Sequence, residues 1–205
     1  AFGPRQHGRV GVNLQNRLSG GAIVGLKEQM LSVLGDSQTR RIHFTLTGST
    51  GLSITVDASS FRRVANAIRS EAIKVNEGGV ASGWAQYNAR NNTFNVSTGA
   101  EWSRAYNALL VHESVHASFD LTSSTLPWLD NEVSAYIAQG YYLRNSGFPR
   151  SRLDELGQPY LGVLLVDSVI RTGSFDTALI QELQGTLLSS PQYHSYIRGT
   201  FTGDG

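Results

Sequence analysis

The sequence predicts an α+β fold in a single domain, because helical and strand-like patterns occupy separate stretches of the chain. A stretch with helical apolar spacing comes first, segments of alternating apolar and polar residues follow, and the second half has helical spacing throughout. The 205 residues are enough for one substantial core, and no repeat, low-complexity tract or long linker divides them. We therefore expect one domain over residues 1–205.

The chain begins with an arm, a helix and a strand pair. Residues 1–20 lack apolar periodicity and are predicted to form a loose N-terminal arm. Residues 22–36 have helical spacing and end near a glycine, which is typical of a helix terminus. Residues 41–46 and 52–58 alternate apolar and polar residues on either side of a glycine-containing turn, so they predict two connected strands.

The next segments predict a helix and a hairpin. The helix should cover residues 61–74, with Ser60 as its N-cap. Residues 82–88 and 92–97 alternate apolar and polar residues around a short turn, which indicates a β-hairpin. The remaining chain is expected to be helical over four stretches, residues 101–120, 130–147, 160–173 and 175–188.

The composition argues against several functional classes. The formal net charge is +1, so there is no electrostatic case for a nucleic-acid partner. No apolar run approaches the roughly 20 residues that span a bilayer, so we expect no membrane attachment. Only 16% of the residues are charged and neutral polar residues are abundant, which suits a secreted or exported protein. Its start lacks the apolar segment of a signal peptide, so a signal would have been removed or another route used.

Residues 112–116 have the sequence HESVH, a pattern that on a helix places two histidines around one metal ion. His112 and His116 would lie on the same face, and Glu113 would lie beside them as a candidate catalytic base. The chain has no cysteine, so histidines and carboxylates must supply every side-chain ligand. The alternative is a helix with two ordinary polar histidines.

A catalytic zinc ion usually has three protein ligands and a water, so a third ligand is needed. Glu132 follows His116 after a short connecting segment and begins the next predicted helix. If the two helices run antiparallel, both residues lie near the shared turn. Asp120 and Asp130 are also close to this turn, and Glu132 could instead be an acid that stabilises its helix start.

The run HESVH followed by NEVSAY resembles the gluzincin group of zinc metallopeptidases, over residues 82–145. The resemblance implies one Zn²⁺ per chain, held by both histidines and Glu132, with Asn131 as an orienting neighbour. It extends to the broad group only. The interval between the motifs is short for a thermolysin-like enzyme, and Tyr136 stands where that family often has an acidic residue.

The resemblance also implies a zincin-like arrangement. A small mixed sheet with an edge hairpin would precede the active-site helix, and a helical half would follow it. The outer strand of the hairpin would pair with the substrate backbone, which makes Gly83, Trp84 and Ala85 candidates for substrate contact. The alternative is an ordinary structural hairpin.

Other catalytic roles are less closely defined by the sequence. An oxyanion donor is expected from outside the motif, and His194 or Tyr193 is preferred. Asp120 could accept a hydrogen bond from a ligand histidine or simply end its helix, and Asp130 is expected to be an N-cap. The remaining oxyanion candidates are Tyr141, Tyr142 and Tyr196.

Together the motif and the resemblance predict a zinc-dependent endopeptidase that acts on a protein or peptide. Zinc would activate a water, and Glu113 would take its proton and pass it to the leaving amine. The alternative is a secreted effector or toxin-like module that uses a zincin scaffold to bind a partner protein without proteolysis. The intact Glu113 argues against that alternative. We expect a monomer.

Overall fold

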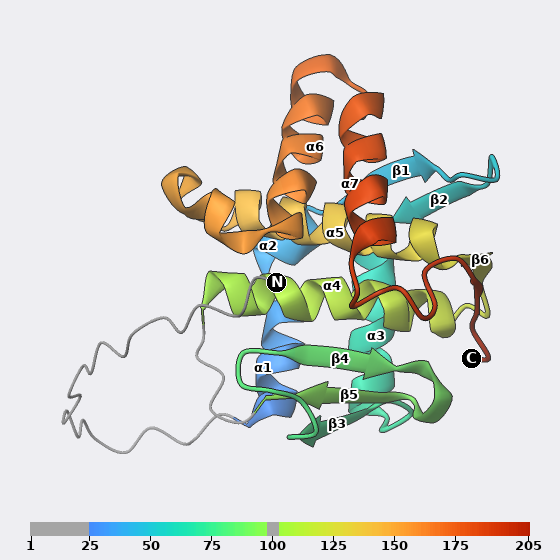
Figure 1. Ribbon diagram of the computed structural model, residues 1–205. Helices are drawn as coiled ribbons and strands as arrows, with labels where there is room; N and C mark the ends of the chain where they lie inside the picture. Colours follow the sequence, from blue (N-terminus) through green and yellow to red (C-terminus); the bar gives the residue numbers. More distant parts are fainter. Residues whose placement is uncertain (1–24, 98–102) are drawn as a thin grey trace, which may run out of the picture.

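The computed structural model describes residues 25–97 and 103–205, and Figure 1 shows their arrangement. The predicted arm over residues 1–20 lies outside these ranges. The α+β fold is confirmed, since small sheets and helices are followed by helix α4 and by a helical C-terminal half. Apolar side chains from both halves contribute to a continuous buried core. None of the described helices combines the length and apolar character needed to cross a bilayer.

Two helices and a strand pair open the described chain. Their bounds are α1 (Leu26–Gly35), α2 (Ser37–Arg40), β1 (Phe44–Thr47) and β2 (Ser53–Val56). β1 and β2 pair antiparallel, with Phe44 opposite Val56. The alternating pattern in the sequence therefore predicted this pair, and α1 falls inside the helix expected over residues 22–36.

Helix α3 (Ala58–Arg69) begins and ends earlier than the helix predicted over residues 61–74. Its N-cap is Asp57, whose carboxylate accepts hydrogen bonds from the amides of Ser59 and Ser60. In return the Ser60 hydroxyl accepts from the Asp57 amide, which completes a capping box. The prediction of Ser60 as N-cap was wrong because both residues are good caps, and only their mutual bonding identifies the helix start.

Three strands form the second sheet, in the order β3-β5-β4. They are β3 (Lys74–Glu77), β4 (Ala85–Asn88) and β5 (Thr93–Val96). The antiparallel pair of β4 and β5 confirms the predicted hairpin, and β4 is an edge strand. β3 pairs parallel to β5 and was not predicted, because its largely exposed side chains give no alternation of apolar and polar residues.

Helix α4 (Arg104–Asp120) passes between this sheet and helix α5 (Trp128–Asn145), as Figure 1 shows. From residue 110 to residue 120 every side chain of α4 is buried. Such a helix carries its polar residues into the interior, where each needs a hydrogen-bond partner or another ligand. The histidines and acids of α4 are therefore held by the packing on both sides.

The C-terminal half contains two short strands that the sequence did not reveal. Besides helices η2 (Arg150–Leu156), α6 (Gln158–Thr172) and α7 (Thr177–Ser189), it has β6 (Thr125–Pro127) and β7 (Thr200–Thr202). β7 pairs antiparallel with β6, with Phe201 opposite Leu126. The expectation of helices alone was wrong here, since three residues are too few to show a period. The pair returns the chain to the connection between α4 and α5.

Helices α5 and α6 meet at two glycines. A Cβ on Gly162 would lie 2.2 Å from the Tyr136 carbonyl oxygen, and one on Gly140 would lie 2.3 Å from the Gly162 carbonyl carbon. Both contacts are with backbone, which cannot move aside as a flexible side chain can. The two helices therefore pack at a distance that only glycine permits.

We expect Gly162→Ala to lower the free energy of unfolding by about 3 kcal/mol, at the upper end of the usual cost of over-packing. The matched control is Gly185→Ala on α7, where the added Cβ meets no atom within 4 Å. It should raise stability by roughly 0.5–1 kcal/mol through helix propensity alone. Urea unfolding of both variants measures the difference. Equal effects would contradict the close crossing.

Candidate metal centre

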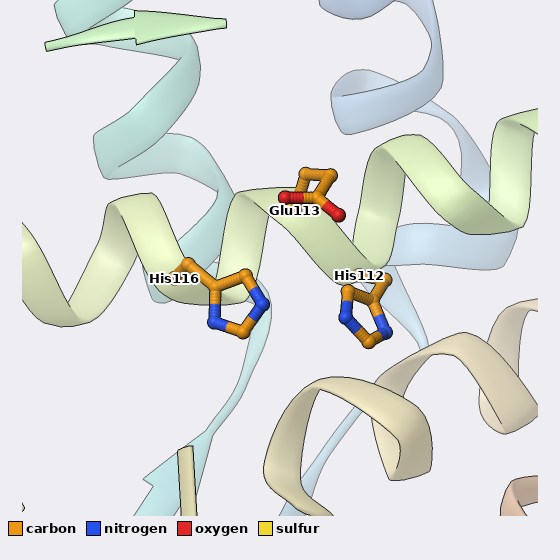
Figure 2. A group of neighbouring side chains, drawn as sticks. All are labelled: His112, Glu113 and His116. Carbon is orange, nitrogen blue, oxygen red and sulfur yellow. The ribbon is translucent and has the colours of Figure 1, made fainter. Parts of the chain in front are cut away.

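His112, Glu113 and His116 form a buried group on α4. Their exposed fractions are 4%, 8% and 7%, and one ligand atom from each lies within 4.8 Å of the others. Figure 2 shows the two imidazole rings on one side of the helix, with Glu113 farther round it. The spacing of four residues produces this arrangement, because it corresponds to about one helical turn. The group could hold a metal ion.

Each histidine ring is oriented by an amide on α5. His112 Nδ1 lies 3.1 Å from Gln139 Oε1, and His116 Nδ1 lies 2.7 Å from Asn131 Oδ1. An amide oxygen only accepts hydrogen bonds, so each Nδ1 carries the proton and each Nε2 keeps a free lone pair. This is the tautomer that a metal ligand needs.

The structure places Asn131 as the expected neighbour of a histidine. Gln139 was missed by the sequence analysis. Its position could have indicated the contact, because it lies seven residues after Glu132 and therefore on the same face of α5.

Glu132 faces both histidines from α5. Its Oε2 lies 3.4 Å from His112 Nε2, and its Oε1 lies 3.8 Å from His116 Nε2. The residue is only 3% exposed, and Oε2 has no hydrogen-bond partner within the described ranges. A buried carboxylate oxygen without a partner is costly. An ion between Oε2 and the two Nε2 atoms would satisfy it.

The charge state of Glu132 suits such a role. Burial alone would raise the pKa of its carboxyl group. The neighbouring His116 and His112, together with the hydrogen bond from Tyr196, outweigh burial and lower that pKa below its ordinary value. Glu132 therefore remains a carboxylate at neutral pH and can act as a ligand.

Glu113 has a different environment. Its Oε2 accepts a hydrogen bond of 2.8 Å from the backbone amide of Tyr87 on β4. Burial raises the pKa of Glu113 to about 7, although the neighbouring His116 and the Tyr87 amide act in the opposite direction. A group that gains and loses a proton near neutral pH is suited to general base chemistry.

Of the proposed oxyanion donors, Tyr196 is the one whose hydroxyl reaches the centre. It donates a hydrogen bond of 3.1 Å to Glu132 Oε1. The two preferred candidates are placed otherwise. The Tyr193 hydroxyl bonds to that of Tyr136, and the His194 side chain is exposed.

The other two candidates have partners elsewhere. Tyr141 stacks on Phe44, and Tyr142 bonds to Asp36.

Aromatic side chains pack against both histidines. The Tyr136 ring packs edge-on against His112, with ring centroids 4.6 Å apart. Trp128 lies against His116 at 6.3 Å and against Tyr196 at 4.8 Å. Tyr136 contributes packing together with a hydroxyl that remains protonated, because burial raises its pKa.

The three proposed substrate contacts lie at the start of the edge strand. Ala85 begins β4, and Gly83 and Trp84 precede it. The Trp84 carbonyl accepts from the Ser97 amide next to β5, whereas the Tyr87 amide turns the other way to Glu113. Backbone groups alternate in direction along a strand, so those of Ala85 also point away from β5. The Trp84 side chain is 50% exposed.

Two acids near the α4–α5 turn have roles that the sequence did not reveal. Asp120 accepts from the Tyr87 hydroxyl at 2.6 Å and from the Asp204 amide at 3.2 Å, while His116 is held by Asn131. Asp130 is not an N-cap, because α5 begins at Trp128. Its carboxylate instead accepts from the amide and hydroxyl of Ser49.

Comparison of the chain with protein-family models, with curated proteins and with solved structures gives no match. The chemistry of the centre must therefore be inferred from its own geometry.

Proposed function

We propose that the protein is a zinc-dependent endopeptidase. One observation supports this above others: the buried, unpartnered Oε2 of Glu132 faces the free Nε2 atoms of two histidines, and a second carboxylate, Glu113, stands beside them. Two histidines and a glutamate, without sulfur, form a donor set that catalytic zinc uses together with a water. His112, His116 and Glu132 would hold one Zn²⁺ per chain.

A bound zinc would lower the pKa of its water and polarise the scissile carbonyl. Glu113 is the base that takes the proton of the attacking water and passes it to the leaving amine. Its Oε2 is held by the Tyr87 amide, so the other carboxylate oxygen is the one available for that proton. Tyr196 is favoured over Tyr193 and His194 as the donor to the oxyanion, because its hydroxyl already lies beside Glu132.

The substrate would bind along β4. An extended peptide adds to a sheet edge through main-chain hydrogen bonds, and the outward backbone groups of Ala85 are placed for them. The exposed indole of Trp84 would contact a substrate side chain. We expect a secreted or exported monomer whose only macromolecular partner is the protein or peptide it cleaves.

We predict that the purified protein contains about one zinc per chain and cleaves a denatured protein substrate. A chelator should abolish cleavage and added zinc should restore it. Elemental analysis and mass spectrometry of the products measure both. Full activity in metal-free protein would contradict the mechanism. Bound zinc without cleavage of any substrate would favour a binding module on the same scaffold.

A further inference from the structure

Tyr87 contacts α4, the metal helix that carries His112 and His116, at two places. Its backbone amide donates to Glu113 Oε2 at 2.8 Å, and its side-chain hydroxyl donates to Asp120 Oδ2 at 2.6 Å. Glu113 and Asp120 are two turns apart on α4, which corresponds to roughly 10 Å along the helix. A single residue of the edge strand therefore spans two turns of the helix that carries the histidines.

Asp120 depends on neutral donors. The residue is fully buried, and no ion pair involving it occurs within the described part of the chain. Its oxygens accept from the Tyr87 hydroxyl and the Asp204 amide, and the Asn92 amide nitrogen donates at 2.9 Å when it faces the carboxylate. Loss of any donor would leave a buried carboxylate oxygen without a hydrogen-bond partner, which is unfavourable. Asp120 therefore stabilises Tyr87 in this position.

The Tyr87 hydroxyl is a permanent donor in this contact. Burial and the adjacent Asp120 carboxylate raise the pKa of Tyr87 well above its ordinary value. The hydroxyl therefore keeps its proton at neutral pH, and its hydrogen bond to a carboxylate is of the strong, charge-assisted type.

The strand needs this fixed point because it has a sheet neighbour on one side only. β5 pairs with β4 along one edge, and at the other edge the Tyr87 amide bonds to Glu113 of α4. Another tyrosine contact near the start of β4 is longer, since the Tyr106 hydroxyl lies 3.4 Å from the Trp84 carbonyl oxygen. A carboxylate rotates easily about its last bond, so the direction of Glu113 depends on where the Tyr87 amide stands.

We propose that Tyr87 is a positioning residue for the catalytic base: its hydroxyl bond to Asp120 fixes β4 along the metal helix, and its amide thereby holds one oxygen of Glu113 while leaving the other free for the water. This inference rests on the proposed peptidase function for its catalytic consequence. The contact itself can be tested without any activity.

The first arm of the test is kinetic and uses the zinc-loaded full chain. Tyr87→Phe should lower kcat roughly ten- to a hundredfold, the usual range for residues that orient a metal site from outside its ligands, with little change in zinc content and a smaller change in KM. The matched control is Tyr142→Phe, which removes a similar tyrosine–aspartate bond, 3.0 Å to Asp36, away from the centre. It should leave kcat unchanged.

The second arm measures hydrogen exchange at the amide of residue 87. Tyr87→Phe and Asp120→Ala should each accelerate exchange there by about tenfold or more, because the strand is no longer fixed against Glu113. The amides of β5 should be unaffected, and Tyr142→Phe should leave residue 87 as in the wild type. Asp120→Ala removes the acceptor and leaves the tyrosine in place, so it serves if Tyr87→Phe does not fold.

The two arms separate the possible failures. If exchange at residue 87 and kcat both match the Tyr142→Phe control, the inference is overturned. If exchange rises while kcat is unchanged, the contact is structural only and the positioning role is wrong. An inactive wild type would count against the peptidase function. Even then, faster exchange in both variants would support the inference that the bond between Tyr87 and Asp120 keeps the Tyr87 amide on Glu113.

Discussion

Replacing Glu113 with Gln should leave the metal in place and reduce the rate of peptide hydrolysis by roughly 10²–10⁴-fold, the range for loss of a general base. Gln has the same shape, and its side-chain oxygen can still accept the hydrogen bond from the Tyr87 amide. It cannot take a proton from water. The strand contact and the histidines are therefore retained, and only the proton transfer is lost. The rate constant for cleavage of a peptide and the zinc content of the same sample measure the two effects.

The control is Glu182→Gln, which removes an exposed carboxylate on α7 and should have no effect on either measurement. Two results would contradict the proposed role of Glu113. If Glu113→Gln cleaves as fast as the wild type, Glu113 is a structural acid. If the variant loses the metal, Glu113 is itself a ligand, which its position within 4.8 Å of the histidine ligand atoms allows.

The sequence predicted the centre well where helical geometry alone decides which residues meet. His112 and His116 share a face because they are four residues apart, and this holds for any α-helix. Glu132 and Asn131 near the start of the next helix face the same histidines. The short connection between α4 and α5 limits where that helix can lie. Helical spacing and a short loop therefore bring the residues near this turn close to the histidines, whereas the choice of Glu132 and Asn131 among them came from the resemblance.

Contacts between distant segments could not be predicted in this way. The choice among the C-terminal tyrosines depends on how residues 190–199 return to the centre, and the short β6–β7 pair that directs them gives no periodic signal. His194 or Tyr193 was preferred, but the segment leaves His194 exposed and brings Tyr196 to Glu132. The bond between Tyr87 and Asp120 likewise depends on the placement of β4 against α4, which neither segment encodes alone.

The strands show the same limit. β1, β2 and β4 have one buried side and one more exposed side, so their alternating pattern is visible. β5 is buried on both sides for most of its length, but its sequence still alternates polar and apolar residues. β3 is mostly exposed and contributes little apolar surface, and it forms through backbone pairing with β5. From the sequence alone, which does not show this pairing, the residues of β3 could not be distinguished from the end of a helix.

Replacing Glu132 with Ala should lower the affinity for zinc by more than a hundredfold and abolish cleavage. Even residues that only orient ligands typically cost roughly ten- to a hundredfold when changed, so loss of a ligand should exceed that range. The substitution also removes the carboxylate whose buried Oε2 has no hydrogen-bond partner in the described structure. In metal-free protein the burial of this unpartnered oxygen is unfavourable. Glu132→Ala should therefore be more stable than the wild type when both lack metal. Competition with a chelator of known affinity measures the metal binding.

Asp130→Ala separates a ligand role from a structural one, because Asp130 lies on the same helix two residues earlier and is also buried. Its carboxylate accepts from the Ser49 amide and hydroxyl, which would lose their acceptor. We therefore expect a loss of about 1–3 kcal/mol in stability, with zinc affinity nearly unchanged. If Asp130→Ala weakens zinc binding as strongly as Glu132→Ala, the carboxylate of Glu132 is not specifically a ligand. The metal would then depend on the packing of α5 as a whole against the two histidines.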